Sequence, residues 1–218
     1  MGKNFEIGLI RVLTSDDQHF VDTHGRQIME NFPGLNVESR CIPDQWEGIH
    51  SPETLAIAKP KIVALAKEFA DKDMILVSCA DDPAVEEIKA ELPGMPVTGG
   101  GETTLALAGF YSDKIAILGI TDYPPKAYME MAGERLIAVG KPVGVDSTLD
   151  LLKEEGKKNI IACAKELKEK GAGVIALACT GLSTIGIAKL LEKEVGIPVI
   201  DPVMAEGAFA YFEAIRKK

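Results

Sequence analysis

The chain has 218 residues, 46% hydrophobic and 26% charged, which is typical of a folded globular protein with a buried core. Its net charge of −9 argues against a nucleic-acid partner, because phosphate binding needs a concentrated basic surface. The apolar run near the first residue is too short for a signal peptide, and no stretch approaches the roughly 20 apolar residues of a membrane span. We therefore expect a cytoplasmic protein with no membrane partner.

Short aliphatic runs alternate with amphipathic segments along the chain, a pattern typical of βαβ units and parallel sheets. The first half predicts strands over 5–13, 35–42, 74–79 and 96–99, and helices over 16–32, 52–70, 83–92 and 102–109. The second half predicts strands over 114–120, 173–179 and 197–200, and helices over 159–170, 183–194 and from Ala205 onward. Residues 121–150 are the least regular stretch, with three prolines and several glycines, and the sequence defines element boundaries least well there.

The two halves contain similar blocks in the same order. MILVSC, which ends at Cys79, matches VIALAC, which ends at Cys179, and GMPV at 94–97 matches GIPV at 196–199. The weakest match pairs IGLIRVLT at 7–14 with IAILGITD at 115–122. An alternative explanation is that any two βαβ units share aliphatic strands and G-x-P turns. This explanation applies most to the third match. The repeated cysteine favours two related α/β lobes.

Cys79 directly follows an apolar run, at the carboxyl end of a predicted strand. We expect Asp82 to cap the next helix and Pro83 to occupy its first position, where a missing N–H costs nothing. The N–H groups of a helix N-terminus favour a thiolate and would hold a substrate carboxylate or imide. Because parallel α/β sheets bind ligands at the carboxyl ends of their strands, this position favours a functional site.

Cys179 ends the matching strand of the second half, and the hydroxyl-bearing Thr180 and Ser183 follow it. We expect the next helix to begin near Thr184. For either cysteine alone, a small buried side chain at a strand end is the commoner account. The occurrence of the same arrangement in both halves favours catalysis.

Two thiols suggest a reaction if the lobes are related by an approximate two-fold axis, because they would then lie on opposite faces of a bound substrate. One thiolate would remove a proton from a stereogenic carbon while the opposite thiol delivers a proton to the other face. The roles reverse for the other enantiomer. This reaction is a racemisation and requires no cofactor.

The remaining cysteines and the histidines show no metal-ligand spacing. Cys163 lies on the apolar side of a predicted helix and Cys41 ends a predicted strand, so we interpret both as packing residues. His19, His24 and His50 lie in polar stretches, where we expect solvated positions. We therefore predict neither a metal site nor a structural disulfide.

The string GGGET at 99–103 precedes an apolar helix and would present backbone N–H groups to an anion. It lacks the G-x-G-x-x-G pattern of a dinucleotide site, and no acidic residue about 20 positions on supports one. Glu102 has two interpretations of equal weight. It is a first-turn acid that favours the helix dipole, or it orients Cys79 or the substrate from behind the site.

Four of these blocks resemble the aspartate/glutamate/hydantoin racemase superfamily, and within it the hydantoin and allantoin racemase branch. SCADDPAV at 78–85 is similar to the cysteine-x-Asp-Asp-Pro block, and PVTGGGET at 96–103 to the Pro-Val-x-Gly-x-Gly-Glu segment. ACTGL at 178–182 resembles the second cysteine block, and GIPVIDPVMA at 196–205 completes the pattern. The likeness spans most of the chain.

The resemblance implies an α/β fold of two pseudo-symmetric Rossmann-like lobes with mainly parallel sheets and an active site in the cleft between them. The first lobe would comprise residues 1–98 and 198–218, and the second residues 99–197. Cys79 and Cys179 would be the acid/base residues. The substrate would be bound by groups of six residues, Ser78, Ala80, Asp81, Asp82, Thr180 and Gly181.

Two segments depart from the hydantoin racemase pattern. Arg11 to Thr14 stand where those enzymes carry Asn-Pro-Asn, and Gly119 to Thr121 stand where they carry Thr-Thr. A positive Arg11 would suit a substrate carboxylate or carbamoyl group, or would pair with a nearby acid. Thr121 is a further substrate-contact candidate.

We therefore predict a cofactor-independent racemase or epimerase that acts on an amino acid, an N-carbamoyl amino acid or a hydantoin-like small molecule, and we expect a homo-oligomer. One alternative keeps the fold and changes the reaction to the isomerisation of a maleate-like diacid or the decarboxylation of a malonate. Another is a two-lobed small-molecule binding protein with no catalysis.

Overall fold

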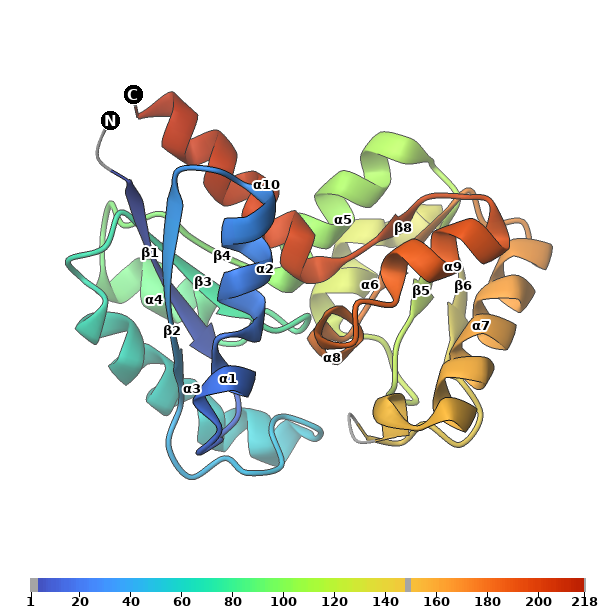
Figure 1. Cartoon of the computed structure of the whole chain (residues 1–218), viewed down its shortest axis with the longest axis horizontal. Helices are drawn as coiled ribbons and strands as arrows, with labels where there is room; N and C mark the ends of the chain where they lie inside the picture. The colour runs from blue at the N-terminus through green and yellow to red at the C-terminus, as the bar shows by residue number, and fades with distance from the viewer. Residues whose placement is uncertain (1–3, 148–149, 218) are drawn as a thin grey trace. The chain divides into compact units, whose positions relative to one another are not determined.

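The computed structural model describes residues 4–147 and 150–217. In these residues the chain forms two four-stranded parallel sheets surrounded by helices (Figure 1). The strands are β1 (Phe5–Arg11), β2 (Leu35–Cys41), β3 (Met74–Ser78), β4 (Val97–Gly99), β5 (Ile115–Leu118), β6 (Leu136–Gly140), β7 (Val174–Leu177) and β8 (Val199–Ile200). The α-helices are α1 (Gln18–Val21), α2 (Thr23–Asn31), α3 (Pro52–Glu68), α4 (Val85–Glu91), α5 (Gly100–Tyr111), α6 (Lys126–Ala132), α7 (Glu154–Glu169), α8 (Thr180–Thr184), α9 (Ala188–Val195) and α10 (Pro202–Arg216), and the 3-10 helices are η1 (Gly133–Arg135) and η2 (Asp150–Leu152).

The two sheets have the same strand order, β2-β1-β3-β4 in one and β6-β5-β7-β8 in the other. This equivalence confirms the matches found in the sequence, since β1, β3 and β4 correspond to β5, β7 and β8. Equivalent hydrogen bonds also occur in the two sheets. The backbone N–H of Ile75 donates to the Pro96 carbonyl at 2.9 Å, and that of Ile175 donates to the Pro198 carbonyl at 2.9 Å.

The chain divides into two compact units, which are described separately. The first unit extends to Gly100 and includes the residues from Glu206 onward, and the second unit comprises Gly101–Ala205. Both divisions fall inside helices, one in α5 and the other in α10. Most of the C-terminal helix therefore belongs to the N-terminal unit.

Helices cover both faces of the sheet in the first unit. Gly8 lies against the ring of Phe69 at the end of α3, and the core on this face includes residues of α3 and α4. On the opposite face, Gly25 of α2 packs against Val37 and Ser39 of β2. The helix α10 lies beside α2 in this layer (Figure 1), where Gly207 approaches the Phe32 ring too closely to carry a side chain.

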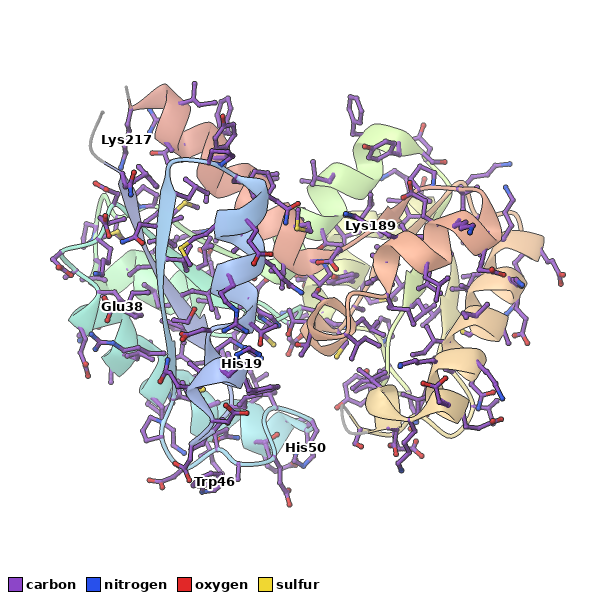
Figure 2. All side chains as sticks on the ribbon, in the orientation of Figure 1. His19, Glu38, Trp46, His50, Lys189 and Lys217 are labelled. Carbon is purple, nitrogen blue, oxygen red and sulfur yellow. The ribbon has the colours of Figure 1, made fainter. Side chains whose placement is uncertain are left out.

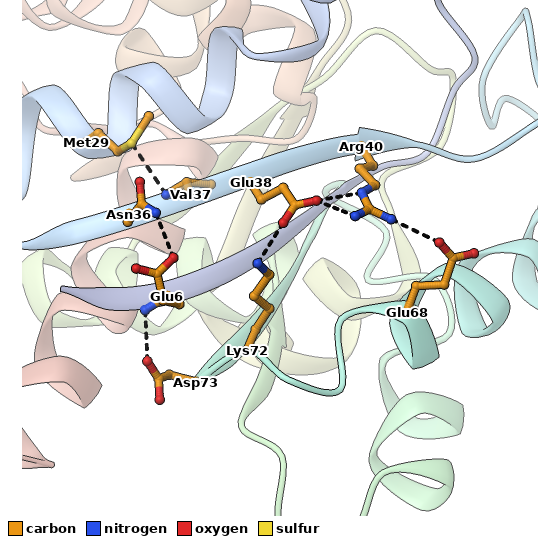
Figure 3. Close-up of polar contacts among 9 residues, drawn as sticks. All are labelled: Glu6, Met29, Asn36, Val37, Glu38, Arg40, Glu68, Lys72 and Asp73. Carbon is orange, nitrogen blue, oxygen red and sulfur yellow. Dashed lines mark hydrogen bonds and ion pairs between the residues drawn. The ribbon is translucent and has the colours of Figure 1, made fainter. Parts of the chain in front are cut away.

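Polar contacts hold the edge strand β2 in register with its neighbours (Figure 3). Asn36 donates to the Glu6 carboxylate at 2.6 Å, and Lys72 pairs with Glu38 at 2.6 Å. Arg40 pairs with Glu38 and with Glu68. Charged residues on an edge strand also oppose pairing with another chain.

The second unit has its main core between the sheet and the helices α7 and α9. One prediction for this unit needs correction. The segment predicted as one helix over 183–194 is two helices, α8 and α9, because Gly186 takes a left-handed backbone at φ +63°. Residues 121–150, for which no element bounds were predicted, contain α6, η1 and β6. The strand β6 is only half-buried, which weakens its hydrophobic signal.

Among the helices of the described residues, none is long and apolar enough to cross a membrane.

Candidate functional site

Each unit places a cysteine just after the third strand of its chain order. In both sheets the first and third strands are neighbours, and the chain leaves them in opposite directions, which is the position where open parallel α/β sheets in general bind ligands. Arg11 and Ser78 pair across this point in the first sheet, and Leu118 and Leu177 pair in the second. The strand order thus places Cys79 and Cys179 at the carboxyl end of their respective sheets, next to the point where the connections diverge.

Hydrogen bonds fix both the N–H and the carbonyl group of Cys79. Its N–H donates to the Val77 carbonyl at 2.7 Å, which turns the chain sharply at Ser78. Its carbonyl accepts hydrogen bonds from the N–H groups of Asp82 at 3.3 Å and Gly100 at 3.2 Å. The half-buried Cys79 side chain is therefore attached to a fixed piece of backbone at the junction of β3, the following turn and α5.

The segment after Cys79 differs from the prediction. The helix α4 begins at Val85, and its N-cap is Ala84 in a left-handed conformation at φ 62° without a side-chain cap. Asp82 also has a positive φ of 48°. Asp82 was expected to cap this helix, but its carboxylate lies against Gly99 at the end of β4. Five residues lie between Cys79 and the first residue of α4, so the prediction that Cys79 sits just before the start of this helix is wrong.

Cys179 is itself the N-cap residue of the short helix α8, with an extended backbone at φ −156°. The prediction that the helix begins near Thr184 is wrong, since α8 ends there. Burial raises the pKa of the Cys179 thiol, and the N–H groups of Gly181 and Leu182 only partly oppose this shift. At this thiol the desolvation therefore outweighs the two backbone donors.

Asp201 lies beside this segment, at the end of β8, and was not singled out by the sequence analysis. Its Oδ1 accepts hydrogen bonds from the N–H groups of Val203 at 2.9 Å and Met204 at 3.1 Å, which caps α10. Burial raises its pKa, and a hydrogen bond from Ser183 partly opposes the rise. The Asp-Pro pair before an apolar run is a sequence signal for this cap.

Three buried polar side chains meet behind Cys79 in the first unit. Ser78 donates from its hydroxyl to Oε2 of Glu206 at 2.9 Å, and its Oγ lies 2.9 Å from Nδ1 of His24. Their exposed fractions are 1% for Ser78 and 0% for both His24 and Glu206. The prediction of a solvated His24 is wrong, because α2 turns this residue and Ile28 to the same buried face.

The other two histidines lie where they were expected. His19 on α1 and His50 before α3 are exposed side chains of the first unit (Figure 2). The sequence contains a signal that separates His24 from them, because His24 and Ile28 have the i, i+4 spacing of one helix face. Glu206 has a comparable signal, since it is the one charged residue in the apolar run VMAEGAFA.

Arg11 ends β1 and is 3% exposed. Its Nη1 donates to the carbonyls of Phe20 at 3.0 Å and Val21 at 3.2 Å, and its guanidinium stacks on the Phe20 ring at 4.8 Å. Burial lowers the pKa of Arg11 to about 10, and the nearby Cys41 and Glu206 partly offset this shift. These contacts hold α1 over the end of the sheet, and the substrate role of Arg11 stays a prediction.

The remaining predicted site residues fall into the two units. Ala80 is buried, and Asp81 is half-buried in the turn after Cys79. Glu102 lies in the first turn of α5, as one of its two interpretations requires. Thr180 and Gly181 begin α8 and are half-buried. Thr121 follows β5, and its hydroxyl donates to the Tyr123 carbonyl at 2.5 Å.

Cys163 occupies the packing position predicted for it, and the same interpretation of Cys41 stays a prediction. Cys41 ends β2 and is half-buried, and burial raises its pKa. Cys163 lies in the core of the second unit, where burial raises its pKa to about 11. Within the described ranges, no three histidine, cysteine or acidic side chains gather as a metal site would require.

The chain thus belongs to a class of α/β proteins with two parallel sheets of identical strand order. In each sheet a cysteine lies where the connections of neighbouring strands diverge. A family model described as Asp/Glu/Hydantoin racemase matches residues 23–207, and the chain belongs to this family. A hydantoin racemase from Paenarthrobacter aurescens is 31% identical over 146 residues, or 61% of this chain. The matched region spans 58% of that relative's length.

Solved structures share the fold over nearly the whole chain. An allantoin racemase from Klebsiella pneumoniae superposes with a TM-score of 0.81 at 22% identity, covering 98% of this chain and 89% of that one. A maleate cis-trans isomerase from Nocardia farcinica, solved with a covalently bound succinylcysteine intermediate, has a TM-score of 0.70 at 18% identity, covering 95% and 91%. At these identities the likenesses establish the fold.

Proposed function

We propose that this chain is a cofactor-independent racemase or epimerase in which Cys79 and Cys179 are the acid and base. One observation carries the proposal. The two cysteines occupy equivalent positions after β3 and β7, at the switch points of two sheets with the same strand order. Membership of the racemase family and the 31% identity to a hydantoin racemase support it.

The proposed reaction moves one proton off a stereogenic carbon and another onto its opposite face. One cysteine thiolate takes the proton and becomes a thiol, while the other thiol gives up its proton and becomes a thiolate. Burial favours the neutral thiol of Cys179, which suits this residue to the part of proton donor in the scheme. The cycle requires both sulfur atoms to reach the same carbon.

The proposed substrates are amino acids, N-carbamoyl amino acids and hydantoin-like rings. Their polar groups would be held by the turn after Cys79 and by the start of α8. The proposed contacts are with Ser78, Ala80, Asp81, Asp82, Thr121, Thr180 and Gly181. A direct contact with Arg11 would compete with its hydrogen bonds to α1, so we assign Arg11 a supporting part in shaping this end of the sheet.

The substrate class can be found by incubating the protein in D₂O with separate enantiomers of amino acids, N-carbamoyl amino acids and 5-substituted hydantoins. Deuterium uptake at the stereogenic carbon, followed by NMR, reports proton removal without knowledge of the product. We expect uptake with one class together with loss of optical rotation. Uptake with none of the three classes would contradict the proposal.

Single variants test the two roles. Cys79→Ser and Cys179→Ser should each abolish racemisation, and each should exchange the α-hydrogen of one enantiomer only. Cys41→Ser is the matched control, because Cys41 is a half-buried thiol at the carboxyl end of the neighbouring strand β2 and should retain activity. Full racemisation by either of the first two variants would rule out the two-base scheme.

A second reaction is favoured by the likeness to the maleate isomerase structure, whose cysteine carries a covalent succinyl group. In that reaction a thiolate adds to the double bond of a diacid, the single bond rotates, and the thiolate leaves. The appearance of fumarate from maleate, without change of any chiral substrate, would favour this reaction. Malonate decarboxylation would release CO₂. Binding without turnover would favour a non-catalytic protein.

The cytoplasmic location and the homo-oligomeric state also stay predictions. Light scattering on the purified chain would measure its mass in solution and test the second of them.

A further inference from the structure

The buried trio behind Cys79 has a definite hydrogen-bond polarity. The Ser78 hydroxyl has one proton, which it donates to Oε2 of Glu206, so its Oγ accepts the bond from His24. Nδ1 of His24 therefore carries a proton. The chain of hydrogen bonds runs from the imidazole through the hydroxyl to the carboxylate, which stabilises the charged form of Glu206.

The carboxylate also lies beside the backbone of Cys79. A Cβ atom on Gly100 would lie 3.0 Å from Oε1 of Glu206 and 3.1 Å from the carbonyl oxygen of Cys79. The absence of a side chain at Gly100 makes room for the carboxylate next to the hydrogen bond that joins Gly100 to Cys79. The trio thus adjoins the segment that carries the thiol through the Glu206 carboxylate and through Ser78, its middle member, which directly precedes Cys79.

Packing alone does not account for this arrangement. Burying a carboxylate, an imidazole and a hydroxyl is costly unless all are hydrogen-bonded, and apolar side chains of similar size would fill the same space. Arg11 at the end of β1 is the cation that interacts with Glu206, and it also interacts with Cys41 of β2. Asp81 and Asp82 lie in the turn after Cys79, and the Asp82 carboxylate lies against Gly99, the residue before Gly100.

We propose that Glu206, held in place by Ser78 and His24, is a positioning residue that makes the Cys79 thiolate a stronger base. A fixed negative charge near a thiol opposes its ionisation, and the thiolate that does form binds a proton more tightly. Removal of a proton from carbon benefits from such a base. This inference rests on the proposed role of Cys79, but its test does not require racemase activity.

The test is the pH dependence of Cys79 alkylation by iodoacetamide, measured by peptide mass spectrometry. Glu206→Gln keeps an acceptor for Ser78 but removes the charge. We expect the pH of half-maximal alkylation to fall by about one unit, so that Cys79 reacts about tenfold faster at pH 7. Glu213→Gln is the matched control, since it makes the same change on the same helix at a residue paired with Arg216, and should leave the profile unchanged.

Two results would overturn the inference. One is a Cys79 profile that is unchanged or shifted upward in folded Glu206→Gln protein, and the other is an equal shift in Glu213→Gln. If Glu206→Gln does not fold, the same alkylation profile of Cys79 is measured in Ser78→Ala and judged in the same way. Loss of the hydroxyl donor favours the neutral form of Glu206, so its shift should also be downward. If the Cys79 alkylation profile shifts but the protein racemises no substrate, the proposed function is rejected and the inference about Glu206 stands.

Discussion

The carboxylate of Asp82 occupies the space where a side chain on Gly99 would lie. Asp82 reaches this position through its left-handed backbone at φ 48°, in the turn that follows Cys79. Gly99 is the last residue of β4. The end of one strand thus sets the shape of the turn that follows the neighbouring strand.

Gly99→Ala should therefore destabilise the protein. The new methyl group would also lie 3.2 Å from the Asp82 Cα atom, so the side chain cannot simply swing away. We expect a loss of about 1–3 kcal/mol in the free energy of unfolding, measured in urea. Gly119→Ala is the control, because its methyl group would meet Ala178 at an ordinary 3.5 Å.

The loss of unfolding free energy caused by Gly99→Ala should depend on the presence of Asp82. Asp82→Gly removes the carboxylate and relieves the positive φ, so Gly99→Ala should cost less than about 1 kcal/mol in that background. Equal penalties in both backgrounds would show that the two residues are not coupled.

Asp201→Asn should change how stability depends on pH. The raised pKa means that folding disfavours the ionised form of Asp201. Its contribution to stability is therefore full below the unfolded value of 3.8 and declines as the pH rises through the folded pKa. Asparagine keeps an oxygen to cap α10 but does not ionise. The stability of the parent relative to the variant should be higher at pH 3.5 than at pH 7.

Urea unfolding at the two pH values measures this difference. Asp113→Asn removes an equal charge at an exposed residue of the same unit and serves as the control. A parent protein that gains stability over Asp201→Asn between pH 3.5 and pH 7 would contradict the prediction.

Tyr128→Phe should loosen the end of β7. The fully buried hydroxyl of Tyr128 donates to the Leu177 carbonyl at 2.6 Å, two residues before Cys179. Its loss should lower the free energy of unfolding by about 1–2 kcal/mol. Tyr111→Phe, at a side chain that is 55% exposed, should change it by less than about 0.5 kcal/mol. Equal effects of the two substitutions would argue against this tether.

Cys163 should resist alkylation in the folded protein. It is 7% exposed, and burial raises its pKa to about 11, so at pH 8 both access and ionisation are unfavourable. We expect its peptide to stay unlabelled by iodoacetamide over the time in which the half-buried Cys41 begins to react. Denaturation in urea should make the two labelling rates similar. Early labelling of native Cys163 would show that the α7 core opens readily.

The hydrophobic patterns of adjacent residues predicted most of the fold. The strands β1, β3, β5 and β7 are buried aliphatic runs, whose signal depends only on adjacent residues, and they lie close to the predicted ranges. The strand β6 escaped prediction because it is half-buried and lies at a sheet edge. The start of α4 was misplaced because Asp82 lies against Gly99 on another strand, where no local cap preference applies.

The sequence by itself determined the alternation of strands and helices, the correspondence between the two halves, and the position of Cys79 and Cys179 after equivalent strands. These features depend on short-range periodicity, which is visible in the order of the residues. Only the tertiary structure decided that His24, Ser78 and Glu206 form one buried chain, because the two hydrogen bonds join residues 54 and 128 positions apart. Burial, which raises the pKa of Cys179, is likewise a property of the packed unit.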